Sequence, residues 1–239
     1  MSYMNIMSFF GWFPDTKHGA PYVSHKSHTH TTQALSEDTT PVEHTDKYKI
    51  VVVLDESGSM DCIRDSMRTA LNGLISEQRT VKERPCNFTL VKFSDNVHRV
   101  IKNKPLDQVK SLEQSDYSPN GNTALYDAVG DTINWYRHER DVLMVIITDG
   151  QENSSKKYRK DQVLRMIKEK EQYAGWSYVY LSCDLNTAAQ GDGIGLSTSK
   201  ACSNCIVAQS RYGDFIGNVS EAIKNNRQYN TSVQSQLNH

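Results

Sequence analysis

Apolar residues along the chain gather in short, near-continuous runs separated by longer amphipathic segments. Three such runs cover residues 50–54, 142–148 and 176–181. Runs of this kind are typical of parallel strands buried on both faces of a sheet, whereas half-exposed strands alternate between apolar and polar residues. The pattern therefore predicts a central parallel sheet.

Two further segments, residues 87–93 and 97–101, are less continuous and alternate between apolar and polar residues. Ser94-Asp95-Asn96 separates them and is a turn signal. A hairpin is therefore expected here, which makes one edge strand antiparallel. Residues 202–207 are predicted as the last strand.

Helical periodicity fills the gaps between these strands. Residues 60–79 repeat apolar side chains on one face, and residues 124–137, 158–172 and 215–223 show related patterns. Strands that alternate with helices predict an α/β fold with three layers, in which a doubly wound, mainly parallel sheet has one antiparallel edge strand. In such folds ligands bind beyond the carboxyl ends of the strands, where the strand order reverses.

The ends of the chain differ in composition from its centre. Residues 1–45 are predicted as a flexible N-terminal tail, 46–225 as the folded domain and 226–239 as a polar C-terminal tail. The first tail contains Phe9-Phe10-Gly11-Trp12-Phe13, which would either cover apolar surface of the fold or dock onto a partner. Both interpretations stay open.

Oxygen-bearing side chains follow two of the predicted strands and occupy one loop between them. Asp55, Ser57 and Ser59 come directly after the first apolar run, Thr123 lies in an Asn- and Gly-rich turn, and Asp149 directly follows the second run. Each residue alone could cap a helix. Together, on three loops, they suit a hard divalent cation, and we expect Mg²⁺, with Mn²⁺ or Ca²⁺ as alternatives.

The sequence also predicts the placement or role of several residues in and around this set. Asp55 is expected on a surface loop rather than in the core, so that Asp55→Ala would spare the fold. Glu56 and Glu152 are interpreted as solvent-facing charges that tune cation affinity, and Asn153 as a residue that orients a loop. Residues 119–123 are rich in turn formers and are expected to be the moving part.

The five oxygen-bearing residues, in this order, resemble the von Willebrand factor A (vWA) domain family and its metal-ion-dependent adhesion site. That site combines D-x-S-x-S after the first strand, a middle-loop Thr and an Asp after the fourth strand. The resemblance implies that Ser57 and Ser59 coordinate the metal directly, and that Asp55, Asp149 and Thr123 do so directly or through water. It also implies that a Glu or Asp of a partner protein completes the coordination.

Residues 168–181 and the segments that follow look like small vWA proteins from bacteria and their viruses. Those proteins often carry a Gly-Ala-Asn loop where this chain has Ser182-Cys183-Asp184-Leu185-Asn186, a departure close to the rim of the expected site. The resemblance implies a non-enzymatic adaptor in a multi-protein assembly, including assemblies built around AAA+ ATPases. The chain has no Walker A motif, so such an ATPase would be a separate polypeptide.

Composition narrows the partner classes. The 239 residues carry a formal net charge of -1, which gives no global attraction to nucleic acid, and no apolar run approaches the ~20 residues of a membrane span. The five cysteines are odd in number and scattered, which favours a reduced, cytoplasmic protein. Cys202 and Cys205 form a C-x-x-C pair that is interpreted as structural rather than as a redox or zinc site.

Two other functions compete with the protein-binding module. One is a structural component of a virus particle or another large assembly. The other is a metal-dependent hydrolase with Asp55 as nucleophile, which is disfavoured because the chain lacks both the second Asp of dehalogenase-type phosphatases and a G-x-S-x-G elbow.

Overall fold

The computed structural model of the chain describes residues 47–182 and 212–237. The aromatic N-terminal segment, the strand predicted at 202–207 and the Cys202–Cys205 pair lie outside the described residues. None of the helices within the described ranges combines the length and the apolar character that crossing a bilayer requires.

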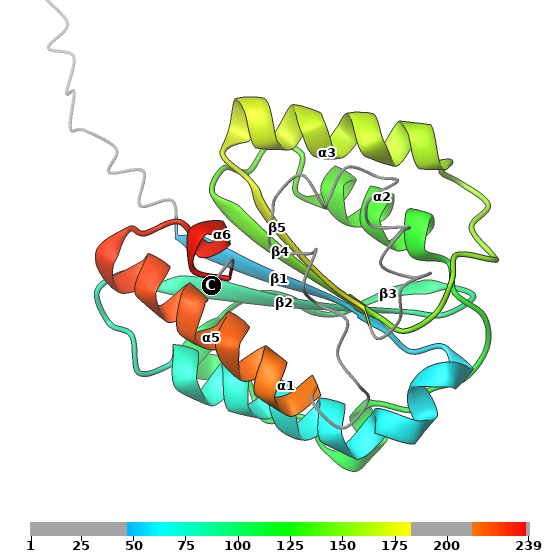
Figure 1. Cartoon of the computed structure of the whole chain (residues 1–239), viewed down its shortest axis with the longest axis horizontal. Helices are drawn as coiled ribbons and strands as arrows, with labels where there is room; N and C mark the ends of the chain where they lie inside the picture. Colours follow the sequence, from blue (N-terminus) through cyan, green and yellow to red (C-terminus); the bar gives the residue numbers. More distant parts are fainter. Residues whose placement is uncertain (1–46, 183–211, 238–239) are drawn as a thin grey trace, which may run out of the picture. The chain divides into compact units, whose positions relative to one another are not determined.

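Five strands form one sheet in the order β3-β2-β1-β4-β5 (Figure 1). β1 pairs in parallel with both β2 and β4, β4 pairs in parallel with β5, and β3 pairs antiparallel with β2. The predicted mainly parallel sheet with one antiparallel edge strand is thereby confirmed. The strands are β1 (Tyr48–Asp55), β2 (Cys86–Phe93), β3 (Val97–Pro105), β4 (Val142–Thr148) and β5 (Ser177–Ser182).

The strand order reverses between β1 and β4. From β1 the chain first builds outward through β2 and β3, and then crosses to β4 and β5 on the other side. Asp55 is the last residue of β1, and Asp149 directly follows β4. The switch point of the sheet therefore brings together two carboxylates that are far apart in the sequence.

Helices cover both faces of the sheet and give it two separate cores. Ile50, Val52 and Leu54 of β1 pack on the side of α1 and α5, whereas Val51 and Val53 pack on the side of α2 and α3. This alternation explains the continuous apolar run, because neighbouring residues of β1 contribute to opposite cores. The helices are α1 (Arg64–Gln78), α2 (Leu125–Trp135), α3 (Lys160–Ala174) and α5 (Tyr212–Tyr229).

The segment predicted as one helix from residue 60 is divided in two. A 3-10 helix, Gly58–Ile63, precedes α1, which begins at Arg64. The tighter turn arises because Ser57 O accepts a hydrogen bond from Met60 N (3.1 Å) while Gly58 N is bound to Gly121 O (3.1 Å). The loop after β1 is thus shaped by its neighbours before the α-helix starts.

The C-terminal boundary expected at residue 225 falls inside α5. Beyond it, Arg227 and Val233 are buried, and the short helix α6 (Val233–Gln236) follows. Val233 belongs to the same apolar core as α1 and α5. The folded part therefore continues through residues whose polar composition resembles that of a tail.

Candidate functional site

Three loops that carry the candidate residues meet at the carboxyl ends of β1 and β4. Backbone hydrogen bonds join them: Gly58 N donates to Gly121 O (3.1 Å), and Asn153 N donates to Thr123 O (3.1 Å). A third bond runs from Asn120 N to Glu56 O (2.8 Å). The loop positions are therefore held mutually by main-chain contacts.

The oxygens of the first and last motifs lie at distances that suit shared coordination. Ser57 Oγ is 3.2 Å from Ser59 Oγ, and Ser59 Oγ donates to Asp149 Oδ1 over 2.6 Å. Neighbouring ligands of an octahedral Mg²⁺, bound at about 2.0–2.1 Å, lie roughly 2.9 Å apart. The observed separations bracket that value, so these side chains fit such an ion.

Gly150 shows that the remaining oxygens face the same small space. An ideal Cβ on Gly150 would lie 2.6 Å from Thr123 Oγ1 and 3.4 Å from both Asp55 Oδ2 and Ser57 Oγ. The structure thus gathers all five predicted residues into one cluster, hereafter the oxygen cluster. It contains two carboxylates and three hydroxyls. Within residues 47–182 and 212–237, no group of three or more His, Cys, Asp and Glu side chains has the arrangement of a metal site.

Asp55 is not on the surface, contrary to expectation. Its side chain is 0% exposed because it ends the central strand, flanked by β2 and β4. Ser57 N donates to Oδ1 (2.7 Å) and Thr148 Oγ1 donates to Oδ2 (2.6 Å). Burial raises the pKa of Asp55 to about 6 against the opposing effect of these hydrogen bonds, and the negative charge of Asp149 raises it further.

Glu56 does not face solvent either, so the prediction of a solvent-facing charge at this position is wrong. Its carboxylate lies 2.7 Å from Lys92 Nζ and accepts a hydrogen bond from Ser118 N (2.8 Å). The side chains of Glu56 and Lys92 are 15% and 14% exposed. Glu56 therefore fixes the loop that leads to Thr123 rather than presenting a charge to the solvent.

Glu152 has a similar structural role. It accepts hydrogen bonds from Tyr126 N (2.9 Å) and Ser155 N (2.8 Å), which ties the loop after β4 to the start of α2. Its neighbour Asn153 accepts from Thr123 N (2.9 Å), as expected of a residue that orients a loop. Glu152 is thus a loop anchor and not the solvent-facing charge predicted from the sequence.

Three further residues support the cluster and were missed by sequence reasoning. Thr148 binds Asp55, and Tyr117 donates its hydroxyl to Asp55 O (2.7 Å). Asp127 accepts from the backbone N–H groups of residues 156–158. Of the three, Thr148 could have been identified from the sequence, since it is a hydroxyl residue in an otherwise apolar run. No sequence pattern distinguishes Tyr117 or Asp127.

A family comparison identifies the domain. The profile of the von Willebrand factor type A domain matches residues 49–180. The chain belongs to the von Willebrand factor type A domain family. vWA domains are typically metal-dependent protein–protein interaction modules. A comparison with curated protein sequences finds no match.

Solved structures share the fold of this vWA domain at low sequence identity. The PilB minor pilin from Streptococcus sanguinis is 12% identical (TM-score 0.56; 81% of this chain, 65% of that chain). The vWF domain of the type V pili tip protein Mfa5 from Porphyromonas gingivalis is 10% identical (0.56; 78% and 98%). Proximal thread matrix protein 1 from the mussel byssus, with a zinc-occupied MIDAS motif, is 16% identical (0.50; 75% and 46%).

The chain spans less than half of the mussel protein and less than two thirds of the pilin. At these identities the likeness shows the fold alone.

Proposed function

We propose that the chain is a metal-dependent protein-binding module whose oxygen cluster holds a divalent cation of the Mg²⁺ type. The observation that carries the proposal is the convergence of five oxygen-bearing residues at the switch point between β1 and β4. A MIDAS motif occupied by zinc in the mussel protein supports a divalent ion at this place in the fold. The ligands are Asp55, Ser57, Ser59, Thr123 and Asp149.

The chemistry of the cluster favours capture of an acidic partner. Three of its five donors are neutral hydroxyls, so the bound cation would keep much of its positive charge. Such an ion takes one more anionic oxygen readily, and a Glu or Asp side chain of a partner protein supplies it. Binding of the partner would then depend on the metal.

Binding is favoured over hydrolysis by the placement of Asp55. A hydrolase of the alternative class would use this carboxylate as a nucleophile, yet Asp55 is fully buried and accepts two hydrogen bonds.

A non-enzymatic role as an adaptor in a cytoplasmic assembly belongs to the same proposal. Cys62 and Cys86 are free thiols, which fits a reducing compartment.

Metal binding is tested first on the isolated protein. Isothermal titration with Mg²⁺, Mn²⁺ and Ca²⁺ would compare the wild type with Ser59→Ala and with the matched control Ser76→Ala, whose exposed serine lies on α1. Ser59→Ala should weaken metal binding by about tenfold or more, as expected for loss of a direct ligand. Equal affinities of the two variants would refute the assignment of Ser59.

Partner capture is tested by affinity pull-down from the native host extract. The three arms are wild type in Mg²⁺, wild type in EDTA, and Ser59→Ala in Mg²⁺. A protein retained only in the first arm would identify a metal-dependent partner, including any AAA+ ATPase. The same proteins in all three arms would overturn the proposal.

A further inference from the structure

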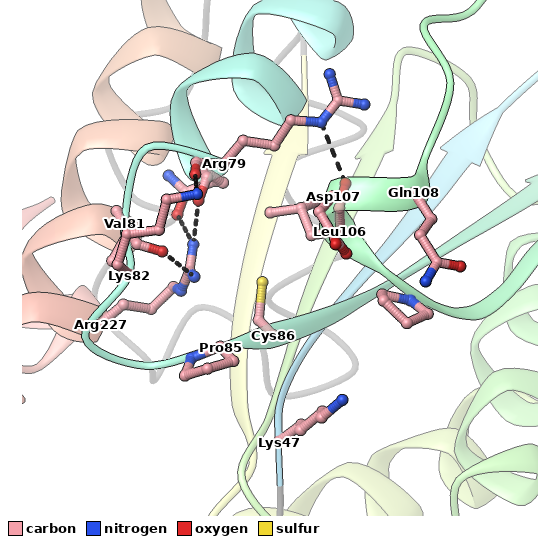
Figure 2. Close-up of a pocket in the computed structure, with 12 residues that line it drawn as sticks. Lys47, Arg79, Val81, Lys82, Pro85, Cys86, Leu106, Asp107, Gln108 and Arg227 are labelled. Atoms are coloured by element: carbon pink, nitrogen blue, oxygen red, sulfur yellow. Dashed lines mark hydrogen bonds between the residues drawn. The ribbon is translucent and has the colours of Figure 1, made fainter.

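A second candidate site lies at the opposite end of the sheet from the oxygen cluster. A hollow of about 350 Å³ opens where β1 and β2 begin and β3 ends (Figure 2). Because β1 spans eight residues, the two sites are separated by roughly 25 Å. The hollow is lined mainly from the end of α1, the segment before β2, the segment after β3 and α5.

Positive charge gathers around this hollow. Lys47, Arg79, Lys82 and Arg227 line it, and Asp107 is the acidic residue in the lining. In the described residues, none of these four cationic groups lies within 4.0 Å of a carboxylate. The hollow therefore carries an excess of positive charge.

Arg227 contributes a buried charge that only neutral groups compensate. It is 4% exposed, and its guanidinium donates to the backbone oxygens of Gln78 (2.6 Å), Val81 (3.1 Å) and Arg84 (2.8 and 3.0 Å). Burying a charge without a counter-ion is costly even when it is hydrogen-bonded. The nearby acid, Glu83, is exposed, so water screens it.

Part of the lining of the hollow is apolar and neutral. Val81, Pro85 and Leu106 line it, and Figure 2 shows Arg227 on one side, Leu106 on the other and the Cys86 sulfur directed between them. Burial raises the pKa of the Cys86 thiol to about 11, although positive Arg227 opposes that shift. The thiol is therefore neutral at pH 7 and leaves the positive charge unbalanced.

Hydrogen-bond donors at the rim can reach a ligand. The Arg79 side chain uses Nε to bind Leu106 O (3.1 Å), which fixes the guanidinium beside the hollow. Lys82 Nζ makes one bond, to Arg79 O (2.9 Å), and has three N–H groups. Figure 2 shows the Arg79 guanidinium above Leu106 and the Lys82 ammonium beside the Arg79 backbone, so the two cations lie at different points of the rim. Each of them suits a phosphate or carboxylate group.

We propose that this hollow binds a small organic anion, with a phosphate or carboxylate group attracted by the Arg79 and Lys82 charges at its rim and an apolar body against Val81 and Leu106. Its volume lies within the roughly 300–1,000 Å³ of ligand pockets in proteins. Arg227 adds favourable potential from beneath without donating to the ligand, since its donors are already bound. The site is independent of the oxygen cluster and of any metal.

The test uses the full chain, labelled with ¹⁵N, and three probes of similar size: phenyl phosphate, benzoate and neutral phenol. Amide shifts should cluster at residues 79–86 and 105–108 with one or both anions and be much smaller with phenol. Lys82→Gln should weaken anion binding about five- to tenfold. Lys168→Gln, which removes an exposed lysine on α3, should leave it unchanged.

The stronger of the two anions would identify the preferred head group. A second variant, Arg79→Gln, should weaken the same anion and keep the unfolding midpoint near that of the wild type. The proposal is overturned if neither anion binds, if the shifts scatter over all lysine-bearing surfaces, or if Lys82→Gln and Lys168→Gln bind equally.

Discussion

Thr148 Oγ1 donates a 2.6 Å hydrogen bond to Asp55 Oδ2 and so joins the ends of two neighbouring parallel strands. Both side chains are 0% exposed. The bond holds one carboxylate oxygen of Asp55 in place, while Ser57 N holds the other (2.7 Å). The orientation of the buried carboxylate is therefore set by the protein before any cation binds.

Replacing Thr148 with Val should destabilise the protein and weaken metal binding. The change removes the hydroxyl at nearly constant volume and leaves Asp55 short of one buried donor, which costs about 1–3 kcal/mol. Urea denaturation in EDTA and in Mg²⁺ measures both effects. Thr132→Val is the matched control, because that buried hydroxyl binds Ala128 O within α2. Equal losses of Mg²⁺-dependent stability in the two variants would contradict the role given to Thr148.

The pH dependence of stability in EDTA should carry the signature of Asp55. Its pKa is about 6 in the folded protein against 3.8 for the ordinary group, so the folded state binds the proton more tightly. The contribution of Asp55 to the free energy of unfolding therefore falls as pH rises from about 4 to about 6, by roughly 2–3 kcal/mol. Above that range the penalty is constant.

Substituting Asp55 with Asn should remove this contribution. Relative to the wild type, the variant should gain stability as pH rises from 4 to 6, measured by urea denaturation at several pH values. Asp65→Asn, at an exposed position on α1, should follow the wild-type curve. A constant difference between wild type and Asp55→Asn over this range would show that Asp55 does not titrate there.

Gly150→Ala should damage the oxygen cluster. The new Cβ would lie 2.6 Å from Thr123 Oγ1, so either the threonine or the loop must move. We expect metal affinity to fall by about tenfold or more, measured by titration. Gly73→Ala is the control, since nothing lies within 4 Å of its Cβ in the middle of α1. It should stabilise the protein by about 0.5–1 kcal/mol and leave metal binding unchanged.

Glu152→Ala should loosen the loop after β4. The loss of a carboxylate that accepts from Tyr126 N and Ser155 N leaves these donors to the solvent. Amide hydrogen exchange should accelerate across residues 151–158 and at the start of α2. Glu169→Ala, at an exposed position on α3, should leave exchange there unchanged. Unchanged exchange in Glu152→Ala would mean that other contacts suffice to hold the loop.

Sequence patterns predicted the sheet and the convergence of Asp55 with Asp149 because both depend on local signals. Strands buried on two faces give unbroken apolar runs. The residues that directly follow neighbouring parallel strands lie at the same edge of the sheet, and so they lie close together. The burial of Asp55 and the pairing of Glu56 with Lys92 were missed. That pair joins the loop after β1 to β2 over 36 positions of the sequence, so no local periodicity indicates it.

Two helix boundaries were also missed from the sequence. The 3-10 helix at Gly58–Ile63 depends on a bond from Gly58 N to the distant Gly121 O. The extension of α5 past residue 225 depends on Arg227 binding oxygens before β2. Tertiary contacts decide both, and amphipathic periodicity does not record them.

The division of β1 between two cores restricts how the length of this chain can vary. Ile50 and Val51 enter opposite cores, so one residue gained or lost within the strand would exchange every later side chain between the two faces. Asp55 would then turn away from Thr148. Insertions and deletions in natural variants should therefore spare residues 48–59 and accumulate in more exposed connections, such as residues 137–141.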